Sequence, residues 1–435
     1  MNRRLLGNVG AGVLVVFSAG IFVKEVVSPS ILQPSPNLSA LGNDFAAYYM
    51  GSWEVAQGKS PYHGVEVSEQ ARYHLTEEGR DLLGVPNQTI PAYIYPPLLA
   101  LVMQPFVSLD FRSALTAWML LNCVFAVLCL LLCTYLYVPR SSWAIPAGLL
   151  TLIVLASMPT RETILLGQIN FVAFFLCLAA FIASGRQHPY LAGCLLAVAA
   201  WIKVTPILLL IYFLYHKRNW RVLGGFLLAS FGFATWAVAA IGLQESVRYV
   251  TRILPSAGLS QLSLRNKSFL AMFDRLFGSN PLMTPAIDLP WLAVALKGGF
   301  VMALFYGAYR LRRRVTEDVK RDPETSDRFL YAAMLVVMLL CQPLLEIHHL
   351  VFVCPALAFI SGSVLRRHPV GIGIAAGIVM AMLNSRGWNV FAKLGDHWTL
   401  VFLIAPQAWG LLLLGALLAF CSYWKWLPRL SRTPS

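Results

Sequence analysis

One acidic residue, Asp44, stands where a carboxylate could do acid–base chemistry at a membrane surface. It precedes the run Phe45-Ala46-Ala47-Tyr48-Tyr49, whose aromatic side chains are of the kind that lie between lipid and water. As a general base, Asp44 would accept a proton at the mouth of a membrane cavity. As a helix N-cap, it would only satisfy backbone N–H groups of a helix from Phe45 onward. The residues alone leave both interpretations open.

Three further polar side chains stand at the ends of predicted helices. Lys203, in Ile202-Lys203-Val204-Thr205-Pro206, lies at the tip of a tight helical hairpin. Its ammonium group could bind a phosphate or extend to lipid headgroups. Gln168 and Asn170 are amides at a helix entrance, where they could cap the helix or hydrogen-bond a sugar. Each side chain has one binding interpretation and one structural interpretation.

His348 and His349 follow Glu346 at the outer end of a predicted helix. Two imidazoles and one carboxylate without a favoured spacing are a weak indication of zinc, so we assign no metal ligands. Hydrogen bonding near a catalytic acid or a phosphate fits the histidines better, and an ordinary place in the membrane interface is the alternative. The chain has no Walker loop, GxSxG or HExxH motif, which argues against a nucleotide-driven pump or a hydrolase of those types. We predict no cofactor, and divalent-metal dependence is left open.

These residues belong to a chain whose composition requires lipid as its solvent. Of its 435 residues 58% are hydrophobic and 12% are charged, with a mean hydropathy of +0.65, whereas soluble domains carry about a quarter charged residues. The apolar stretches suit helices that cross about 30 Å of hydrocarbon, and they lack the alternation of barrel strands. All 8 cysteines lie in apolar runs without a CxxC motif, so we interpret them as packing residues. The composition therefore predicts an all-α polytopic membrane protein.

Basic residues in short connectors set the predicted topology. The net charge of +14 lies mostly in these connectors, as in cytoplasmic loops of membrane proteins, and does not indicate nucleic acid. We predict that Arg3 and Arg4 stay in the cytoplasm and that residues 5–23 are a retained helix rather than a cleaved signal peptide. Residues 1–435 then form one domain of the cell membrane, with about twelve spans and both termini cytoplasmic. The predicted spans are approximately 5–23, 112–138, 142–158, 168–184, 190–202, 205–215, 221–241, 291–309, 329–344, 350–363, 369–384 and 398–420.

Two longer loops, residues 24–111 and 242–290, fall on the extracytoplasmic side in this topology. The first ends in residues 93–109, which prolines divide into pieces too short to span, so we predict a half-inserted or interfacial helix there. A full span at that place would move every later basic connector to the outer side, against the usual charge distribution. The same outer face receives Asp44, Arg161, Gln168, Lys203, His348 and His349.

A series of short motifs occurs along the chain in a recognisable order. They are Asn43-Asp44-Phe45, Gly58 with Ser60-Pro61-Tyr62, Tyr95-Pro96-Pro97-Leu98, Gly167-Gln168-Ile169-Asn170, Ala192-Gly193, Ile202-Lys203-Val204-Thr205-Pro206, Asn266-Lys267-Ser268 and Pro343 to His349. This series resembles glycosyltransferase family 87, which includes polyprenol-phosphate-mannose-dependent mannosyltransferases and related arabinofuranosyltransferases. The resemblance covers roughly residues 40–360. The sequence departs from the family pattern in two places. Asn43 precedes Asp44 where many such enzymes have a second acid, and the second outer loop has Asn266-Lys267-Ser268-Phe269 where a run richer in Gln and Gly is expected. These departures bear on the identity of the acceptor more than on the type of reaction.

The resemblance implies a GT-C fold, with an extracytoplasmic active site and a sugar donor carried on polyprenyl phosphate. The acid of the first outer loop, here Asp44, would be the general base of an inverting transfer to a hydroxyl of a lipid or glycan acceptor. The candidate contacts to the donor phosphate or sugar are Tyr95, Arg161, Gln168, Asn170, Lys203, Arg265, Lys267, His348 and His349. A transporter or a flippase for lipid-linked sugars is the alternative. A transporter would be expected to have ionisable residues near the membrane midplane and an internal repeat. Here the ionisable residues lie mostly at helix ends and no convincing repeat is found, which argues against a transporter.

Overall fold

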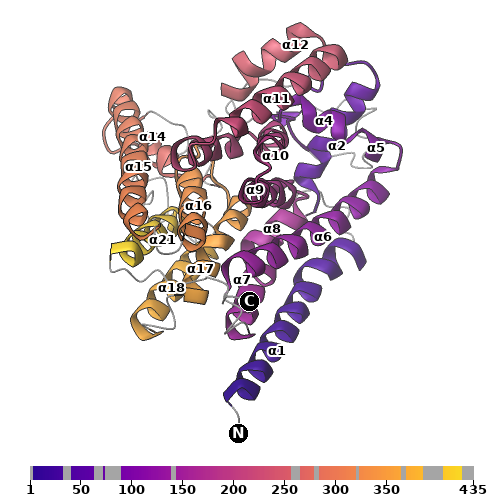
Figure 1. The fold of residues 1–435 in the computed structure, drawn as a ribbon. Helices are drawn as coiled ribbons and strands as arrows, with labels where there is room; N and C mark the ends of the chain where they lie inside the picture. Colours follow the sequence, from indigo (N-terminus) through magenta and orange to yellow (C-terminus); the bar gives the residue numbers. More distant parts are fainter. Residues whose placement is uncertain are drawn as a thin grey trace. The chain divides into compact units, whose positions relative to one another are not determined.

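The structure, a computed structural model, is built almost entirely of helices (Figure 1). It describes residues 3–32, 41–62, 72–73, 90–138, 144–255, 265–278, 284–319, 323–363, 369–385 and 405–423. The chain divides into two compact units. Unit 1 comprises Met1–Gly20, Leu130–Thr160 and Gln261–Ser435, and unit 2 comprises Ile21–Cys129 and Arg161–Ser260. Three helices, α1 (Arg3–Phe22), α6 (Phe111–Tyr137) and α8 (Met158–Leu165), contribute to both units.

Unit 2 contains a buried helix, α2, that packs against short elements of the first predicted outer loop. Helix α2 packs against α4 and α5, which are the two short helices of the 93–109 segment. Proline stands at the first or second position of both short helices, and neither is long enough to span a membrane. The helices of this unit are η1 (Val23–Leu32), α2 (Asn43–Ala56), α4 (Pro97–Val102), α5 (Gln104–Val107), α9 (Asn170–Gly185), α10 (Pro189–Ile202), η3 (Thr205–Leu209), η4 (Tyr212–His216), α11 (Trp220–Ile241), α12 (Leu243–Arg248) and η5 (Tyr249–Ile253). Two short strands, β1 (Arg72–Tyr73) and β2 (Ile90–Pro91), pair antiparallel.

Glycines allow α10 and α11 to pack with their backbones in contact. A Cβ atom on Gly193 would lie 2.0 Å from the carbonyl oxygen of Val222, and one on Gly225 would lie 2.2 Å from that of Tyr190. No side chain larger than hydrogen fits at either position, so small residues fix this crossing, as is common between membrane helices. The close pair holds α10 in place, and α10 ends at the predicted break before Lys203.

Unit 1 is organised around α16, most of whose residues are buried. Helix α16 packs against α15, α17 and α21, and against the short helix η7 that follows it. The remaining contacts join α14 to α15, α17 to α7, and α18 to α21. The elements of this unit are α7 (Ala144–Leu155), α14 (Phe269–Phe277), α15 (Pro290–Val319), α16 (Pro323–Leu340), η7 (Ile347–Val353), α17 (Cys354–Ser363), α18 (Pro369–Leu383) and α21 (Pro406–Tyr423).

The described residues contain four helices that are long and apolar enough to cross a membrane. They are Val9–Ser28, Phe111–Tyr137, Trp220–Ile241 and Pro290–Val315, and a fifth span results if Met158–Leu165 and Asn170–Gly185, bent by 116°, count as one. The protein is thus a multi-pass membrane protein, but the predicted count of about twelve spans is not confirmed. Several predicted spans correspond to shorter apolar helices, such as Pro189–Ile202 and Ile347–Ser361. Of the predicted cytoplasmic connectors, Arg140, Arg366, Arg367 and residues 320–322 of the connector 310–328 lie outside the described residues.

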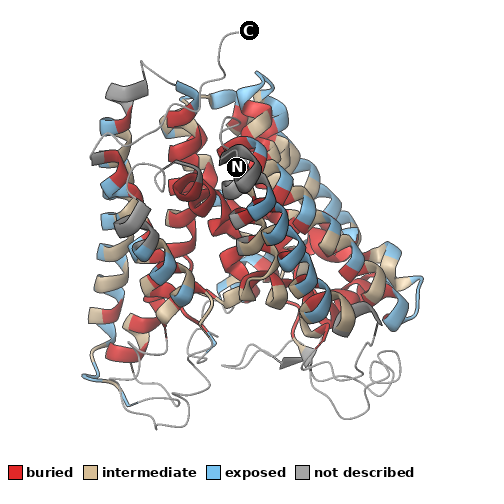
Figure 2. Ribbon diagram, turned by 90° about the horizontal axis from the view of Figure 1, so that it is seen from below, coloured by how far each residue is buried: buried red, intermediate tan, exposed pale blue. Residues whose placement is uncertain are grey.

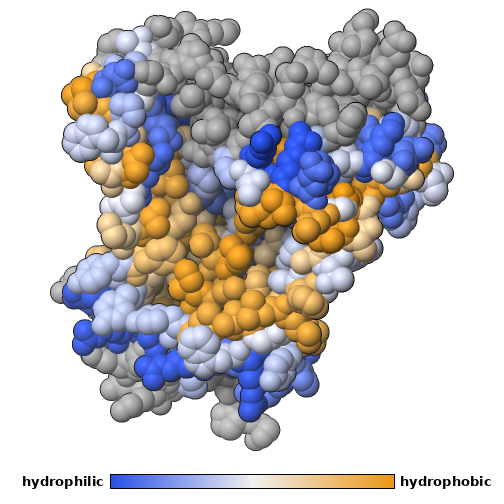
Figure 3. Space-filling view, turned by 90° about the horizontal axis from the view of Figure 1, so that it is seen from above, coloured by the Kyte–Doolittle hydropathy of each residue, from blue (hydrophilic) through white to orange (hydrophobic). Residues whose placement is uncertain are grey.

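Exposed apolar side chains line the long helices. Leu228 and Phe231 on α11 are 71% and 73% exposed, and Met302 on α15 is 69% exposed. Buried residues concentrate on the inner sides of the helices in Figure 2, and Figure 3 shows hydrophobic side chains gathered in the middle of one face. Apolar surface of this extent is unfavourable in water and favourable in lipid. The long helices therefore present their outer sides to the hydrocarbon.

Candidate active site

The first candidate cluster lies in unit 2, where α2 begins against the turn between α8 and α9. The N–H groups of Gly42, Asp44 and Phe45 donate to the carbonyls of Leu165 and Leu166 over 2.7, 3.0 and 3.2 Å. These carbonyls satisfy N–H groups that the start of a helix leaves open. The N-cap residue is Gly42, with a φ of 75°, and no side chain caps the helix. The interpretation of Asp44 as the cap is therefore wrong.

Asp44 is a half-buried carboxylate in the first turn of α2, one turn before Tyr48. The positive end of the helix dipole favours negative charge there. Burial, and then the neighbouring Tyr95 and Asp44, raise the pKa of Tyr48 well above its ordinary value. Tyr48 is therefore a neutral hydrogen-bonding group, and Asp44 is the member of the cluster that can accept a proton.

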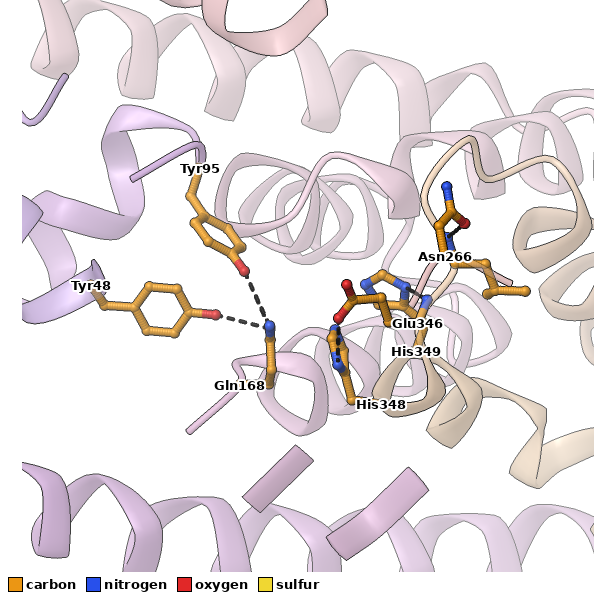
Figure 4. Close-up of polar contacts among 8 residues, drawn as sticks. Tyr48, Tyr95, Gln168, Asn266, Glu346, His348 and His349 are labelled. Carbon is orange, nitrogen blue, oxygen red and sulfur yellow. Dashed lines mark hydrogen bonds and ion pairs between the residues drawn. The ribbon is translucent and has the colours of Figure 1, made fainter. Parts of the chain in front are cut away.

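Gln168 joins two tyrosines of this cluster, as Figure 4 shows. The Tyr48 hydroxyl donates to Gln168 Oε1 over 2.9 Å, and Gln168 Nε2 donates to the Tyr95 hydroxyl over 3.3 Å. The two tyrosine rings meet edge to face with their centroids 4.8 Å apart. Gln168 is only 2% exposed. An amide whose two ends are both engaged holds one orientation, so the three side chains form a fixed polar group.

The turn that carries Gln168 depends on Gly167. Its φ of +72° is unfavourable for other residues, and a Cβ atom there would lie 2.6 Å from the Cβ of Phe45. The Gly167 carbonyl accepts a hydrogen bond of 2.7 Å from Trp118 Nε1. The turn is thereby held against both α2 and α6, and this contact sets the position of Gln168 relative to Asp44.

Tyr95 is supported by residues that were not among the predicted site residues. The Tyr62 hydroxyl donates to the Tyr95 carbonyl over 2.8 Å, and the Tyr62 ring stacks on Tyr249 at 5.5 Å. The neighbouring Ser60 donates to Glu245 over 2.5 Å. The Ser60-Pro61-Tyr62 motif was the one signal for this arrangement, and nothing in the sequence pointed to Glu245. These contacts join the first predicted outer loop to the start of the second.

The other predicted residues of unit 2 lie at separate places. Arg161, on α8, has its guanidinium 3.7 Å from the carboxylate of Glu25. Asn170 is the first residue of α9 and is fully buried. Lys203 follows α10 in an extended conformation and is 7% exposed. A lysine that reaches lipid headgroups would be exposed, so the burial of Lys203 fits an interior contact better.

The second candidate cluster lies in unit 1, where Asn266 joins the loop before α14 to the segment after α16. Asn266 Nδ2 donates to the Pro343 carbonyl over 2.8 Å. Its Oδ1 accepts hydrogen bonds from the backbone N–H groups of Ser268 and Leu345, at 3.0 and 2.9 Å. The N–H of Lys267 donates to the Leu345 carbonyl over 2.6 Å. Three bonds from one buried amide therefore fix the backbone on both sides of Lys267.

Lys267 is a buried cation in this cluster, 1% exposed. Burial and the positive charge of Arg275 lower the pKa of Lys267 to about 7, against the opposing effect of Glu346. A lysine with this pKa is charged in about half of the molecules at neutral pH, and an anion bound beside it would favour the charged form. Arg265, two residues earlier, is exposed.

Glu346, His348 and His349 form the remainder of the second cluster (Figure 4). His348 Nδ1 lies 3.5 Å from Glu346 Oε2. The backbone N–H of Glu346 donates to His349 Nδ1 over 3.0 Å, and the Glu346 side chain accepts the N–H of His349 in a capping box. Both histidines are buried, at 3% and 6% exposure. Within the described residues no group of three or more His, Cys, Asp or Glu side chains could hold a metal ion.

Comparison with known proteins identifies the family of the chain. The profile of glycosyltransferase family 87 matches residues 93–343, which is more than half of the chain. The chain belongs to glycosyltransferase family 87. The polyprenol-phosphate-mannose-dependent α-(1-2)-phosphatidylinositol mannoside mannosyltransferase of Mycolicibacterium smegmatis is 27% identical over 376 residues, covering 81% of this chain and 77% of the relative. Among solved structures, ArnT from Cupriavidus metallidurans bound to undecaprenyl phosphate covers 94% of this chain and 76% of ArnT, with 14% identity and a TM-score of 0.43.

Family 87 membership confirms the resemblance and makes the protein a membrane glycosyltransferase. The matched residues include Tyr95, Gln168, Lys203 and Lys267, whereas Asp44 and the two histidines lie outside them. For a family 87 glycosyltransferase the two clusters differ in their chemistry. The unit 2 cluster offers a proton acceptor among neutral hydrogen-bonding groups, and the unit 1 cluster offers cations and imidazoles suited to an anion.

Proposed function

We propose that this family 87 enzyme transfers a sugar, mannose or another hexose or pentose, from a polyprenyl-phosphate carrier to an acceptor hydroxyl. The reaction takes place on the extracytoplasmic side, with inversion at the anomeric carbon, in a GT-C fold. The observation that carries this proposal is the mannosyltransferase relative, whose name states dependence on polyprenol-phosphate-mannose and which aligns with 81% of the chain. The acceptor is a lipid or glycan hydroxyl.

Asp44 is the general base in this proposal. The acceptor hydroxyl attacks the anomeric carbon, the bond from that carbon to the phosphate oxygen breaks, and Asp44 takes the hydroxyl proton. Asp44 is half-buried in the first turn of α2, where the positive end of the helix dipole favours negative charge. The fixed hydroxyl and amide groups of Tyr48, Tyr95 and Gln168 supply neutral hydrogen bonds of the kind that hold sugars.

The cations and histidines bind the donor. The phosphate leaves with negative charge, and buried Lys203 and Lys267 stabilise it more strongly than exposed side chains would. His348 and His349 contribute hydrogen bonds to the phosphate or the sugar, and Arg161, Asn170 and Arg265 complete the set of donor contacts. No nucleotide is needed, because the energy of the transfer comes from the phosphate–sugar bond that is broken.

The single membrane domain is proposed to lie in the cell membrane with both termini cytoplasmic and residues 24–111 and 242–290 outside. Gln244 and Arg314 are exposed and suit cysteine labelling of the two sides. With a membrane-impermeant maleimide on intact cells, we expect labelling of Gln244→Cys but not of Arg314→Cys until the membrane is permeabilised. Labelling of both variants from outside would contradict this topology.

The test of the function is sugar transfer by the purified protein in detergent. A panel of polyprenyl-phosphate sugars is incubated with candidate lipid and glycan acceptors, and the products are identified by mass spectrometry. We expect a product that is heavier than one acceptor by a single sugar residue, together with free polyprenyl phosphate. A flippase or transporter would bind such donors without forming either product, so protein that binds donors and yields no product would overturn the proposal.

A further inference from the structure

The two adjacent histidines face groups of opposite kind at the same ring atom, an N–H donor at His349 and a carboxylate at His348. For His349, the partner of Nδ1 is the backbone N–H of Glu346, at 3.0 Å. A backbone N–H can only donate, so His349 Nδ1 must carry the lone pair. The neutral ring then has its proton on Nε2. His349 cannot take up a second proton at Nδ1 without losing this bond, which belongs to the capping box at the start of η7.

For His348, the group near Nδ1 is the carboxylate of Glu346, at 3.5 Å. A carboxylate can only accept, and a lone pair facing it would be repelled, so His348 Nδ1 must carry a proton. The neutral ring then has its lone pair on Nε2. The two rings lie edge to face with their centroids 4.4 Å apart, so their Nε2 atoms differ in hydrogen-bonding character although the residues are neighbours.

We propose that Glu346 is a positioning residue that gives the two imidazoles opposite hydrogen-bonding characters. The backbone N–H of Glu346 makes His349 a donor at Nε2, and the Glu346 carboxylate makes neutral His348 an acceptor at Nε2. A ligand group that meets His349 must therefore accept a hydrogen bond, and one that meets His348 must donate a hydrogen bond. A ligand with an anionic oxygen beside a hydroxyl group fits this pair.

A sugar joined to a phosphate presents this combination of groups. The assignment of the ligand rests on the proposed function, whereas the assignment of the protons rests on the geometry of unit 1 alone. In a glycosyl phosphate the phosphate oxygen would accept from His349 and a sugar hydroxyl would donate to His348. Lys267, whose charge acts on Glu346, adds a cation to the same cluster.

The proton positions are tested by nitrogen NMR on the purified full-length protein labelled with ¹⁵N-histidine. The chain has 8 histidines, and the signals of the pair are identified by their loss in His348→Gln and His349→Gln, or in the corresponding Asn variants if either Gln variant misfolds. We expect His349 to be protonated at Nε2 and His348 at Nδ1. Finding both rings in the same tautomer would overturn the proposal. The tautomers are determined from the spectrum of the wild-type protein, and the variants serve only to assign its signals.

Glu346→Gln separates the two effects of this residue. The variant keeps the backbone N–H, so His349 should keep its proton on Nε2. Its amide can present either oxygen or NH₂ to His348, so we expect His348 to populate both tautomers. A His348 that remains protonated at Nδ1 alone would show that the carboxylate does not set its state, which would contradict the role given to Glu346.

The ligand assignment is tested by a matched pair of variants at His349. Glutamine places an NH₂ donor near the position of Nε2, whereas phenylalanine keeps the ring shape and removes the donor. We expect the donor KM to stay within about threefold in His349→Gln and to rise about tenfold or more in His349→Phe. Equal KM changes in both variants would refute the donor role of His349. If the wild-type enzyme transferred no sugar, the proposed function would fail while the NMR result stood independently.

Discussion

The two residue clusters of the enzyme are built in different ways. In unit 2 the side chains around Asp44 are tyrosines and an amide, and the N–H groups at the start of α2 are satisfied by backbone carbonyls. In unit 1 the Asn266 side chain binds the backbone on both sides of Lys267, and the functional side chains are a lysine and two histidines. One cluster surrounds a carboxylate with neutral groups, and the other concentrates groups that bind anions.

Under the proposed mechanism, proton transfer belongs to the unit 2 cluster and binding of the phosphate to the unit 1 cluster. A carboxylate beside hydrogen-bonding tyrosine and amide groups can accept a proton from a bound hydroxyl. A buried lysine can make a strong charge-assisted hydrogen bond to a bound phosphate. Variants in unit 2 should therefore change kcat, and variants in unit 1 should change the donor KM.

The largest expected effect is that of Asp44→Asn. The variant keeps the side-chain volume and removes the proton acceptor, and the N-cap at Gly42 is unaffected. We expect kcat to fall about 10²-fold or more, with donor KM within about twofold of wild type. Asn43→Ala, one residue earlier in the same turn, is the control and should keep near-normal kcat. A folded Asp44→Asn enzyme with near-normal kcat would remove the base from this cluster.

Lys267→Met should have the next largest effect. The substitution keeps an unbranched side chain and removes the cation, so we expect the donor KM to rise about 10- to 100-fold, as for loss of a charged hydrogen bond. Arg265→Met is the comparison, because Arg265 is a proposed donor contact that is exposed rather than buried, and it should change KM by less than about threefold. An equal rise in both variants would mean that burial gives Lys267 no advantage.

The pH dependence of donor binding follows from the same lysine. With a pKa of about 7, Lys267 is mostly protonated below neutral pH and mostly neutral above it. Donor affinity should therefore fall as the pH rises through about 7, and Lys267→Met should abolish this dependence. In the unliganded protein the unfolded chain, with an ordinary lysine pKa of 10.5, binds more protons than the native state above pH 7. Lys267 should thus make stability rise with pH from about 7 to about 10.5, as a series of melting temperatures would show.

Gln168→Leu tests whether the unit 2 cluster is a fixed polar group. Leucine keeps the volume but leaves the buried hydroxyl of Tyr48 without its acceptor, which typically costs about 1–3 kcal/mol. We expect a lower melting temperature and a lower kcat, with a smaller change in donor KM. Gln168→Glu retains an acceptor for Tyr48 and should recover part of the stability. A donor KM that rises as much as in Lys267→Met would contradict the division between the clusters.

The smallest effect is expected from substitutions of Tyr62, which hydrogen-bonds the Tyr95 backbone, and of Tyr249, which stacks on Tyr62. Tyr62→Phe removes the hydrogen bond to the Tyr95 carbonyl, so we expect a loss of about 1 kcal/mol in stability and a few-fold drop in kcat. The Tyr249 hydroxyl is buried and has no hydrogen-bond partner within the described residues. Tyr249→Phe should therefore be neutral or stabilising. Equal losses in both variants would show that the hydrogen bond from Tyr62 gives Tyr95 no specific support.

Long apolar segments could be predicted from the sequence to within a residue or two. The predicted spans 112–138 and 221–241 correspond to Phe111–Tyr137 and Trp220–Ile241, because hydrophobic runs with polar borders define such helices. The break before Lys203 was also predicted correctly. The number of spans was not confirmed, since hydropathy does not reveal that a helix such as α7 (Ala144–Leu155) is only 12 residues long.

The contacts within the clusters could not be predicted from the sequence. Tyr48 and Gln168 are 120 positions apart, and Asn266 and Pro343 are 77 apart, so no local pattern joins them. The capping interpretation of Asp44 was wrong because carbonyls from a distant turn satisfy the start of α2, which residue preferences at helix ends do not reveal. The motifs contain several residues of the two clusters, and only the fold supplies their hydrogen-bonding partners.

The division of labour between the clusters is tested most directly by donor affinity in two purified variants. Binding of one polyprenyl-phosphate sugar is measured to wild-type, Asp44→Asn and Lys267→Met protein below pH 7, in the same detergent. We expect Asp44→Asn to bind the donor within about twofold of wild type and Lys267→Met to bind it about tenfold or more weakly. Weaker binding by Asp44→Asn than by Lys267→Met would contradict the assignment of proton transfer to unit 2 and phosphate binding to unit 1.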